Sequence, residues 1–252
     1  MINAVSIHKE MKNGEGVAVP ILSDVNLAIK AGEVVVIWGP NMCGKSTLLR
    51  VLSGVLHPDS GTVEHAAGVL IGYVPQDEKV SLLPWFDAER NVRFLSRGQC
   101  DKNSAEQLLA DFGFYVNFTT HKKDDARKRP HQLSGGLQQR LAMACAFGSG
   151  ANCLIMDEPF SGQDEQAVNA LISRITCVRT EGRAVVLVTH DPDAAIRCAD
   201  RVCFLKPQNK CGSKIAGSLL INLSDRTPSC LDTLAFQKYR EELFQKAHSH
   251  DS

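Results

Sequence analysis

Gly39-Pro40-Asn41-Met42-Cys43-Gly44-Lys45-Ser46 is the stretch that decides the fold of this 252-residue chain. It fits the phosphate-loop pattern G-x-x-x-x-G-K-[ST], and its flanks predict a buried strand at Val34–Trp38 and a helix at Thr47–Leu52. Backbone N–H groups of such a loop and helix start cradle phosphate oxygens. We therefore expect Gly39 through Thr47 to bind the phosphates of a nucleotide, with Lys45 at the β- and γ-phosphates and Ser46 at Mg²⁺.

Length and charge limit the function classes. The chain is long enough for one large α/β domain, or for a core with one inserted subdomain. Lys+Arg and Asp+Glu both total 28, so no global basic field points to nucleic acid. No segment approaches the roughly 18 apolar residues of a membrane span, and the N-terminus lacks a secretory layout. We expect a cytoplasmic protein that reaches any membrane through a partner.

The nine cysteines include no C-x-x-C pair, so the sequence gives little support for metal binding or redox chemistry by these residues. Several lie inside apolar runs and are expected to be reduced fillers of the core. Cys43 differs because it lies inside the phosphate loop, which suggests the hypothesis that its oxidation blocks nucleotide binding.

Short aliphatic runs alternate with helical patterns along the chain, which predicts parallel strands joined by right-handed crossovers. Two early segments, Ala4–His8 and Leu22–Ile29, alternate apolar and polar residues and predict a more exposed antiparallel edge. The expected buried strands are Val34–Trp38, Leu70–Val74, Cys153–Met156, Ala184–Val188 and Val202–Leu205.

The middle of the chain has helical periodicity instead. Asn91–Leu95, Ala105–Phe112 and Gln138–Phe147 have helix-like spacing, the last ending at Gly148. We interpret residues 85–148 as a helical subdomain inserted into an α/β core made of residues 1–84 and 149–222. Residues 223–252 are expected to form a C-terminal helical tail.

Five ordered motifs between residues 1 and 222 resemble those of the ABC ATPases. Leu133-Ser134-Gly135-Gly136-Leu137-Gln138-Gln139-Arg140 resembles their LSGGQ-type signature, and Cys153-Leu154-Ile155-Met156-Asp157-Glu158-Pro159 resembles their Walker B strand with its acid pair. The remaining matches are Gln76 with the Q-loop, Ser161-Gly162-Gln163-Asp164 with the D-loop and His190 with the switch histidine. The resemblance implies ATP as the nucleotide and a P-loop NTPase (RecA-like) fold with a mainly parallel sheet.

The acid pair has a physical rationale of its own. Asp157 ends an apolar strand at its carboxyl edge, where ligands bind in open α/β sheets, and could hold Mg²⁺ near Ser46, through water. The resemblance implies that Glu158 polarises the attacking water and that His190 bonds the γ-phosphate. Gln76 is then expected to contact both Mg²⁺ and the helical insertion.

The turn before Gln138–Phe147 is a second candidate anion site, because small residues open a helix there. The resemblance implies that Ser134, Gly135, Gly136 and Gln138 face the γ-phosphate held by a second cassette, and that Ser161 and Asp164 belong to the segment that couples the two. The implied active unit is a head-to-tail homodimer, or a pair with a second cassette, that encloses two ATP and two Mg²⁺.

Three features depart from the family pattern. Met42 stands where many members have glycine, so its Cβ needs a permitted backbone angle. Gln163 stands where leucine is common. The segment Gly14–Val19 has no aromatic residue to stack on adenine, so only Val17 or Val19 could offer apolar contact there.

Further segments resemble the ATPases of nitrate, sulfonate and taurine-type importers: Leu82-Leu83-Pro84-Trp85, Asn91-Val92-Arg93-Phe94 and Arg129–Ser134. That branch implies integral-membrane permease subunits, at the inner face of the cell membrane, and an extracytoplasmic substrate-binding protein that contacts the chain only indirectly. Leu83, Trp85 and Phe86 are candidates for an apolar groove that receives a permease helix. The alternative is that Trp85 and Phe86 belong to the core of the subdomain. The cargo is not encoded in this chain.

Two other functions compete with an importer ATPase. A soluble ABC protein of repair, translation or assembly would carry long insertions or two cassettes, and neither is visible. A degenerate cassette that binds ATP without hydrolysing it would account for Met42 and the missing aromatic, but Lys45, Asp157, Glu158 and His190 oppose it. Co-purification with a membrane permease separates the importer from the soluble ABC protein. Equal ATPase rates of the wild type and Glu158→Gln would favour the degenerate cassette.

Overall fold

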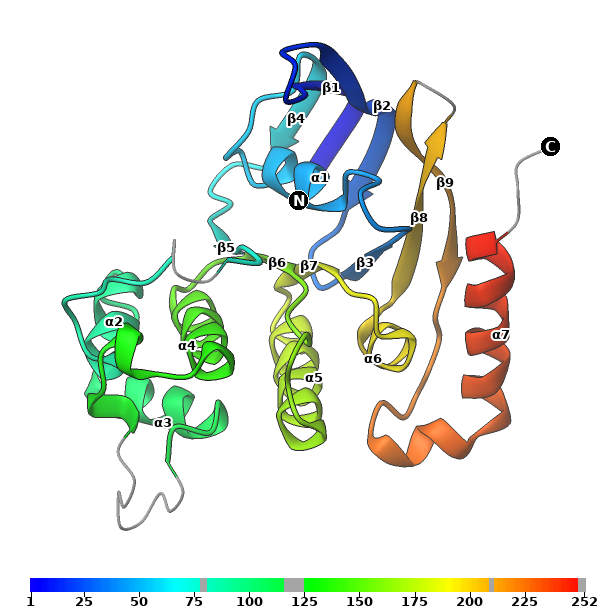
Figure 1. Cartoon of the computed structure of the whole chain (residues 1–252). Helices are drawn as coiled ribbons and strands as arrows, with labels where there is room; N and C mark the ends of the chain where they lie inside the picture. Colours follow the sequence, from blue (N-terminus) through cyan, green and yellow to red (C-terminus); the bar gives the residue numbers. More distant parts are fainter. Residues whose placement is uncertain (78–80, 116–124, 209–210, 249–252) are drawn as a thin grey trace.

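The structure is a computed structural model that describes residues 1–77, 81–115, 125–208 and 211–248. The described residues form one nine-stranded sheet in the order β4-β1-β2-β9-β8-β3-β7-β6-β5, with helices on its faces. Figure 1 shows α2, α3 and α4 together beyond the β5 edge, and α7 next to β8 and β9. Parts of the expected core, helical subdomain and tail (residues 78–80, 116–124, 209–210 and 249–252) lie outside the described residues.

One half of the sheet is parallel, as the aliphatic runs predict. It consists of β3 (Val34–Trp38), β5 (Ile71–Val74), β6 (Cys153–Asp157), β7 (Ala184–Val188) and β8 (Arg201–Gln208). β3 pairs in parallel with β7 on one side and with β8 on the other. The strand before the phosphate loop therefore lies inside the sheet, and its carboxyl end faces the same edge as those of β6 and β7.

The antiparallel part is larger than the sequence predicts. β1 (Ile2–Lys12) pairs with β2 (Ala18–Ile29) and with β4 (Ser60–His65), and β9 (Gly212–Leu220) pairs antiparallel to β8 and in parallel with β2. The sequence did not indicate β4 and β9. Every residue of β4 is exposed or half-buried, so this edge strand lacks the buried aliphatic run used to recognise the others.

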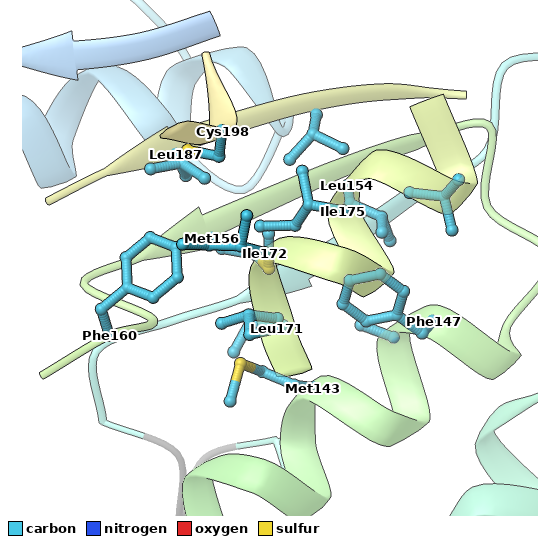
Figure 2. Close-up of a cluster of buried hydrophobic side chains, with 14 of the residues drawn as sticks. Met143, Phe147, Leu154, Met156, Phe160, Leu171, Ile172, Ile175, Leu187 and Cys198 are labelled. Carbon is cyan, nitrogen blue, oxygen red and sulfur yellow. The ribbon is translucent and has the colours of Figure 1, made fainter. Parts of the chain in front are cut away.

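Both faces of the sheet are covered, which explains why β3 is apolar at every position. Val34 and Val36 belong to one buried cluster, and Val35 and Ile37 belong to the other. Figure 2 shows the first cluster, where side chains of α4, α5 and α6 meet those of β6 and β7. The side chains labelled there are Met143, Phe147, Leu154, Met156, Phe160, Leu171, Ile172, Ile175, Leu187 and Cys198.

The helices begin at recognisable caps. Asp87, Asp101, Ser134, Asp164 and Asp191 each accept a backbone N–H with the side chain at a helix start. The α-helices are α1 (Lys45–Leu52), α2 (Ala88–Leu95), α3 (Lys102–Asp111), α4 (Gly135–Gly148), α5 (Glu165–Thr180), α6 (Pro192–Cys198) and α7 (Leu234–His248). Short 3₁₀ turns are η2 (Asp125–Arg127), η3 (Pro130–Gln132) and η4 (Pro228–Asp232).

The segment after β9 is attached to the core through Arg226. Its guanidinium donates to the carbonyls of Arg197, Cys198 and Ala199, at the end of α6, and to Asp200 Oδ1 at 2.9 Å. A cation at the C-terminus of a helix also interacts favourably with the negative end of the helix dipole. Among the described residues, no helix combines the length and the apolar character that crossing a bilayer requires.

Candidate functional site

The loop Gly39–Gly44 joins β3 to α1. At two of its positions only glycine fits, because a Cβ would clash with neighbouring atoms. A Cβ at Gly39 would lie 2.3 Å from the carbonyl oxygen of Leu205, and Gly44 has φ +93° with Ile21 Cγ2 2.8 Å from an added Cβ. Gly44 also precedes Lys45, the first residue of α1. The first backbone N–H groups of α1 have no partner within the helix, which makes this end suited to an anion.

Lys45 is buried (7% exposed) although it is charged. Its Nζ donates to the carbonyl oxygens of Gly39 at 3.0 Å and of Pro40 at 2.8 Å. The ammonium is thereby held over the loop, at the side that opens into the cleft described next. This arrangement presents a fixed positive charge to any phosphate bound at the start of α1.

A cleft of about 520 Å³ brings most of the predicted site together. Five segments far apart in the sequence contribute to it: the phosphate loop, the end of β5, the end of β6, the following turn and the end of β7. The predicted site residues that line it are Asn41, Met42, Lys45, Ser46, Gln76, Asp157, Glu158, Ser161 and His190.

Asp157 has the properties expected of a metal ligand. It is the last residue of β6, is 3% exposed, and its Oδ1 is buried without a hydrogen-bond partner among the described residues. A buried carboxylate oxygen left unpaired is costly, so it requires a cation or a water that the protein alone does not supply. Ser46 and Gln76 line the same cleft and add neutral oxygen ligands of the kind that Mg²⁺ accepts. The residues present therefore fit a Mg²⁺ ion brought in with a nucleotide.

Glu158 follows Asp157 and has a left-handed backbone, with φ +52°. Its carboxylate lies beside His190: Oε1 is 3.2 Å from His190 Nε2, and Oε2 accepts the backbone N–H of His190 at 3.3 Å. Burial raises the pKa of the Glu158 carboxyl, and the neighbouring His190 opposes the rise. A carboxylate with a raised pKa, held toward an open cleft, is suited to accept a proton from water.

His190 has a second neighbour that the sequence did not indicate. The ring of Trp38, the last residue of β3, lies with its centroid 6.4 Å from that of His190, in an edge arrangement of 62°. The imidazole is therefore held between an aromatic ring and a carboxylate, even though 48% of its side chain is exposed. Trp38 could not be recognised from sequence because it completes an apolar run that is already explained as a buried strand.

The signature turn lies outside the cleft of its own chain. Ser134 and Gly135 are exposed, and Ser134 Oγ caps α4 by accepting the N–H of Leu137 at 3.4 Å. Gln138 Nε2 donates to the carbonyl of Leu133 at 3.0 Å, so its amide supports the turn. In the D-loop segment, Asp164 caps α5 through Ala167. An exposed, capped helix start is available to an anion held by another molecule.

Met42 and Cys43 of the phosphate loop differ in exposure. Met42 has φ +64° and is fully exposed, so its side chain extends into solvent and its backbone adopts the left-handed conformation that glycine would take at lower cost. Cys43 is 5% exposed, its Sγ faces the carbonyl of Leu205 at 3.6 Å, and burial raises the pKa of its thiol. A buried thiol of raised pKa is a poor nucleophile, which argues against the hypothesis of a redox switch at Cys43.

The hairpin of β1 and β2 supplies apolar side chains near α1. Met11 and Val19 are cross-strand partners and are 43% and 38% exposed, and Val17 is 56% exposed. Thr47 Oγ1 lies 4.0 Å from Met11 Sδ, which connects this hairpin to the first turn of α1. Met11 lies outside the segment Gly14–Val19, to which the sequence limited the expected adenine contact.

The permease candidates form an exposed aromatic cluster. Trp85 and Phe94 are 61% and 63% exposed, and Phe86 lies between them with ring centroids at 6.3 Å and 5.4 Å. Asn91 is fully buried and fixes the loop beneath them by accepting the N–H of Leu83 and donating to the carbonyls of Leu83, Phe86 and Asp87. This exposure disfavours the alternative that Trp85 is a core residue.

A groove of about 610 Å³ runs between the β5 edge and the helices α2 and α4. Its described lining includes His65, Leu70, Tyr73, Leu95, Arg97 and Cys145. Leu83, Trp85 and Phe86 are not among the described residues that line it.

Comparison with known proteins identifies the family of this chain. The sequence profile of the family described as "ABC transporter" matches residues 22–161. The aliphatic sulfonates import ATP-binding protein SsuB 2 of Pseudomonas syringae pv. tomato is 35% identical over 73% of this chain and 75% of its own length. The Fe(3+) ions import ATP-binding protein FbpC of Haemophilus influenzae is 31% identical over 74% of this chain, and the match spans 56% of that relative.

A solved structure gives the same result for the fold. A dimeric ATP-binding cassette in a post-hydrolysis state, bound to ADP and Pi, superposes with a TM-score of 0.74 at 26% identity, covering 88% of this chain and all of the other. The predicted fold class and the predicted resemblance to sulfonate-type importer ATPases are confirmed. The chain belongs to the ABC transporter family and is an ATP-binding cassette that hydrolyses ATP.

Proposed function

We propose that this chain is the ATP-hydrolysing subunit of an ABC importer and that the cleft between the phosphate loop and His190 is its catalytic site. The observation that carries this proposal is the convergence of Lys45, Asp157, Glu158 and His190 on one cleft from separate segments. A degenerate cassette has no use for an acid and a histidine paired at 3.2 Å beside the phosphate loop.

Hydrolysis follows from the geometry of these groups. ATP lies with its β- and γ-phosphates at the start of α1 and beside the Lys45 ammonium, which stabilises the charge that develops on the transferring phosphoryl group. Glu158 orients the attacking water and takes its proton, and His190 holds that carboxylate and bonds the γ-phosphate. Ser46, Gln76 and Asp157 would hold a Mg²⁺ ion brought in with ATP, which would neutralise phosphate charge.

The complete site takes two copies. In the proposed head-to-tail dimer, Ser134, Gly135, Gly136 and Gln138 of one copy close over the γ-phosphate of the other, with Ser161 and Asp164 near the junction. The exposure and capping of the α4 N-terminus support this arrangement, because its residues are open to solvent and do not line the cleft of their own chain. The dimeric state of the cassette in the solved structure supports it as well.

The membrane partner is proposed from the surface and from the relatives. The groove beside β5 and the exposed aromatic side chains of Trp85 and Phe94 are the proposed contact surface for an inserted helix. Relatives named for import of sulfonates and of Fe(3+) support permease subunits as the partner, with the chain at the inner face of the membrane. The proposed cargo is a small sulfonate-like solute. A substrate-binding protein that contacts the permease would bind it.

The parts of the chain divide these tasks. Residues 1–84 and 149–222 form the proposed nucleotide-binding core, residues 85–148 the subdomain that carries the signature and the permease surface, and residues 223–252 the tail. Met11, Val17 and Val19 offer an aliphatic contact to adenine in place of an aromatic ring.

Affinity purification of the tagged chain from detergent-solubilised membranes of its own cells tests the importer function. We expect integral-membrane permease subunits to copurify in stoichiometric amounts, and to be lost with the double variant Trp85→Ser/Phe94→Ser. ATP binding of that variant should match the wild type. Recovery with soluble partners alone would contradict the importer and favour a non-transport ABC protein.

A further inference from the structure

Two glutamine side chains connect three separate segments behind the cleft. Gln139, on α4, is 8% exposed, and its Nε2 donates to the backbone carbonyl of Glu158 at 2.9 Å. Gln163, just before α5, donates from its Nε2 to Gln139 Oε1 at 2.8 Å. The hydrogen bonds therefore run from Gln163 through Gln139 to the main chain of Glu158.

The direction of this chain of hydrogen bonds is fixed by chemistry. The carbonyl of Glu158 can only accept, so Gln139 must turn its NH₂ group toward it. The oxygen of the same amide then faces Gln163, which has to donate. A leucine or a glutamate at position 163 offers no donor and would leave a buried amide oxygen unpaired or repelled. Glutamine at 163, the departure noted in the sequence, is thus matched to Gln139.

Glu158, which accepts the last of these hydrogen bonds, has a backbone conformation that its surroundings must stabilise. Glu158 has φ +52°, a conformation that costs free energy for a residue with a Cβ and persists only where its surroundings hold it. Its N–H donates to the Val188 carbonyl at 3.0 Å, and its own carbonyl accepts from Ser161 N at 3.2 Å as well as from Gln139. These backbone bonds set the direction in which the Glu158 side chain leaves the main chain, toward His190.

We propose that Gln139 and Gln163 are positioning residues for ATP hydrolysis: Gln139 holds the backbone of Glu158 in its left-handed conformation, and Gln163 acts only by orienting the Gln139 amide. The proposal rests on the proposed role of Glu158. Neither glutamine is among the described residues that line the cleft, so neither is expected to contact ATP. Their loss should lower kcat and leave KM for ATP unchanged.

The test uses the full chain and methionine, which keeps the length of glutamine but has no N–H donor. Steady-state hydrolysis of MgATP is measured for Gln139→Met, Gln163→Met and the double variant, with MgATP affinity by calorimetry. We expect kcat to fall by about 10- to 100-fold for Gln139→Met, since a small misplacement of a reacting group costs up to that much. Gln163→Met should lose less, and the double variant should equal Gln139→Met.

Two controls separate the possible outcomes. Gln166→Met, an exposed glutamine on the first turn of α5, should match the wild type. In a Glu158→Gln background, Gln139→Met should cause no further loss. A wild-type kcat for Gln139→Met, or losses that multiply in the double variant, would overturn the proposal.

The same measurements show whether the catalytic role of Glu158 or only the positioning role of Gln139 is wrong. If Glu158→Gln itself hydrolyses ATP at the wild-type rate, the role of Glu158 is wrong and the positioning role falls with it. If Glu158→Gln is inactive but Gln139→Met is fully active, only the positioning role is wrong. Equal MgATP affinities and equal far-ultraviolet circular dichroism across the variants show that each one is folded.

Discussion

The Glu158 carboxylate and the His190 side chain lie 3.2 Å apart, from Oε1 to Nε2, and the N–H of His190 donates to the second carboxylate oxygen. The two residues follow neighbouring parallel strands, β6 and β7, whose carboxyl ends meet at one edge of the sheet. The pair thus results from the sheet register, in which Asp157 is opposite Val188.

Replacing His190 with alanine should lower kcat for ATP hydrolysis by about 100-fold, because the Glu158 carboxylate loses the side chain that holds it in place. The Glu158 carboxylate then loses the imidazole beside it, while the phosphate loop is untouched. The dissociation constant for MgATP should therefore stay within a factor of about three. His190→Gln, which keeps an N–H donor, should recover part of the rate. Equal rates for His190→Ala and the wild type would show that the pair has no part in hydrolysis.

Arg226→Met should destabilise the fold without changing the chemistry. The variant leaves carbonyls at the end of α6 and the Asp200 carboxylate without their shared donor. We expect the free energy of unfolding to fall by about 2–4 kcal/mol, measured by urea denaturation.

The control for Arg226 is Arg90→Met. The Arg90 side chain is 68% exposed and lies 3.9 Å from Asp87, so its removal should cost less than about 1 kcal/mol. Equal losses for the two variants would mean that Arg226 contributes no more than a surface ion pair.

Met42→Gly should stabilise the protein. Met42 has φ +64° and a fully exposed side chain, so its replacement removes backbone strain and no packing. We expect the free energy of unfolding to rise by about 0.5–1 kcal/mol. Met42→Ala keeps the Cβ and should match the wild type, and a stabilisation shared by both variants would place the effect in the side chain instead of the backbone.

The cysteines should divide by burial when the native protein is treated with iodoacetamide at pH 8. Burial raises the pKa of Cys203 to about 11 and that of Cys153 to about 12, and it raises the pKa of Cys43 as well. The thiolate is the reacting form, so these three should remain unmodified while the exposed Cys177 and Cys211 are alkylated. Mass spectrometry of tryptic peptides reads the result, and rapid modification of Cys43 would restore the redox hypothesis.

The parallel part of the fold was predictable because each of its strands contains an aliphatic run, and a functional motif follows the run in β3, β5, β6 and β7. β3 and β7 have the expected bounds, β5 and β6 differ by one residue, and β8 is longer than the expected Val202–Leu205. β4 was not predictable, since an edge strand made of half-buried and exposed residues has no apolar signature. β9 lies inside the sheet, but most of its residues are half-buried or exposed, so it also lacks an aliphatic run. Pairing across long sequence separations, such as β9 with β2, leaves no local pattern at all.

The site was predictable where a motif fixes both residue type and spacing, as for Lys45, Asp157 and His190. Gln139 belongs to the signature segment, but its contact with the Glu158 carbonyl depends on how α4 packs behind β6, which the sequence does not report. Trp38 and Met11 were missed because an apolar residue in a strand has an adequate structural explanation before its neighbours are known.

The most direct test of the shared catalytic cleft compares the wild type with Glu158→Gln. MgATP binding is measured by calorimetry, and phosphate release is measured on the same samples. We expect both proteins to bind MgATP with the same affinity, and the variant to hydrolyse it about 10²- to 10⁴-fold more slowly, because only proton transfer from water is lost. Equal hydrolysis rates, or no magnesium-dependent ATP binding by the wild type, would contradict the convergence of Lys45, Asp157, Glu158 and His190 on one triphosphate.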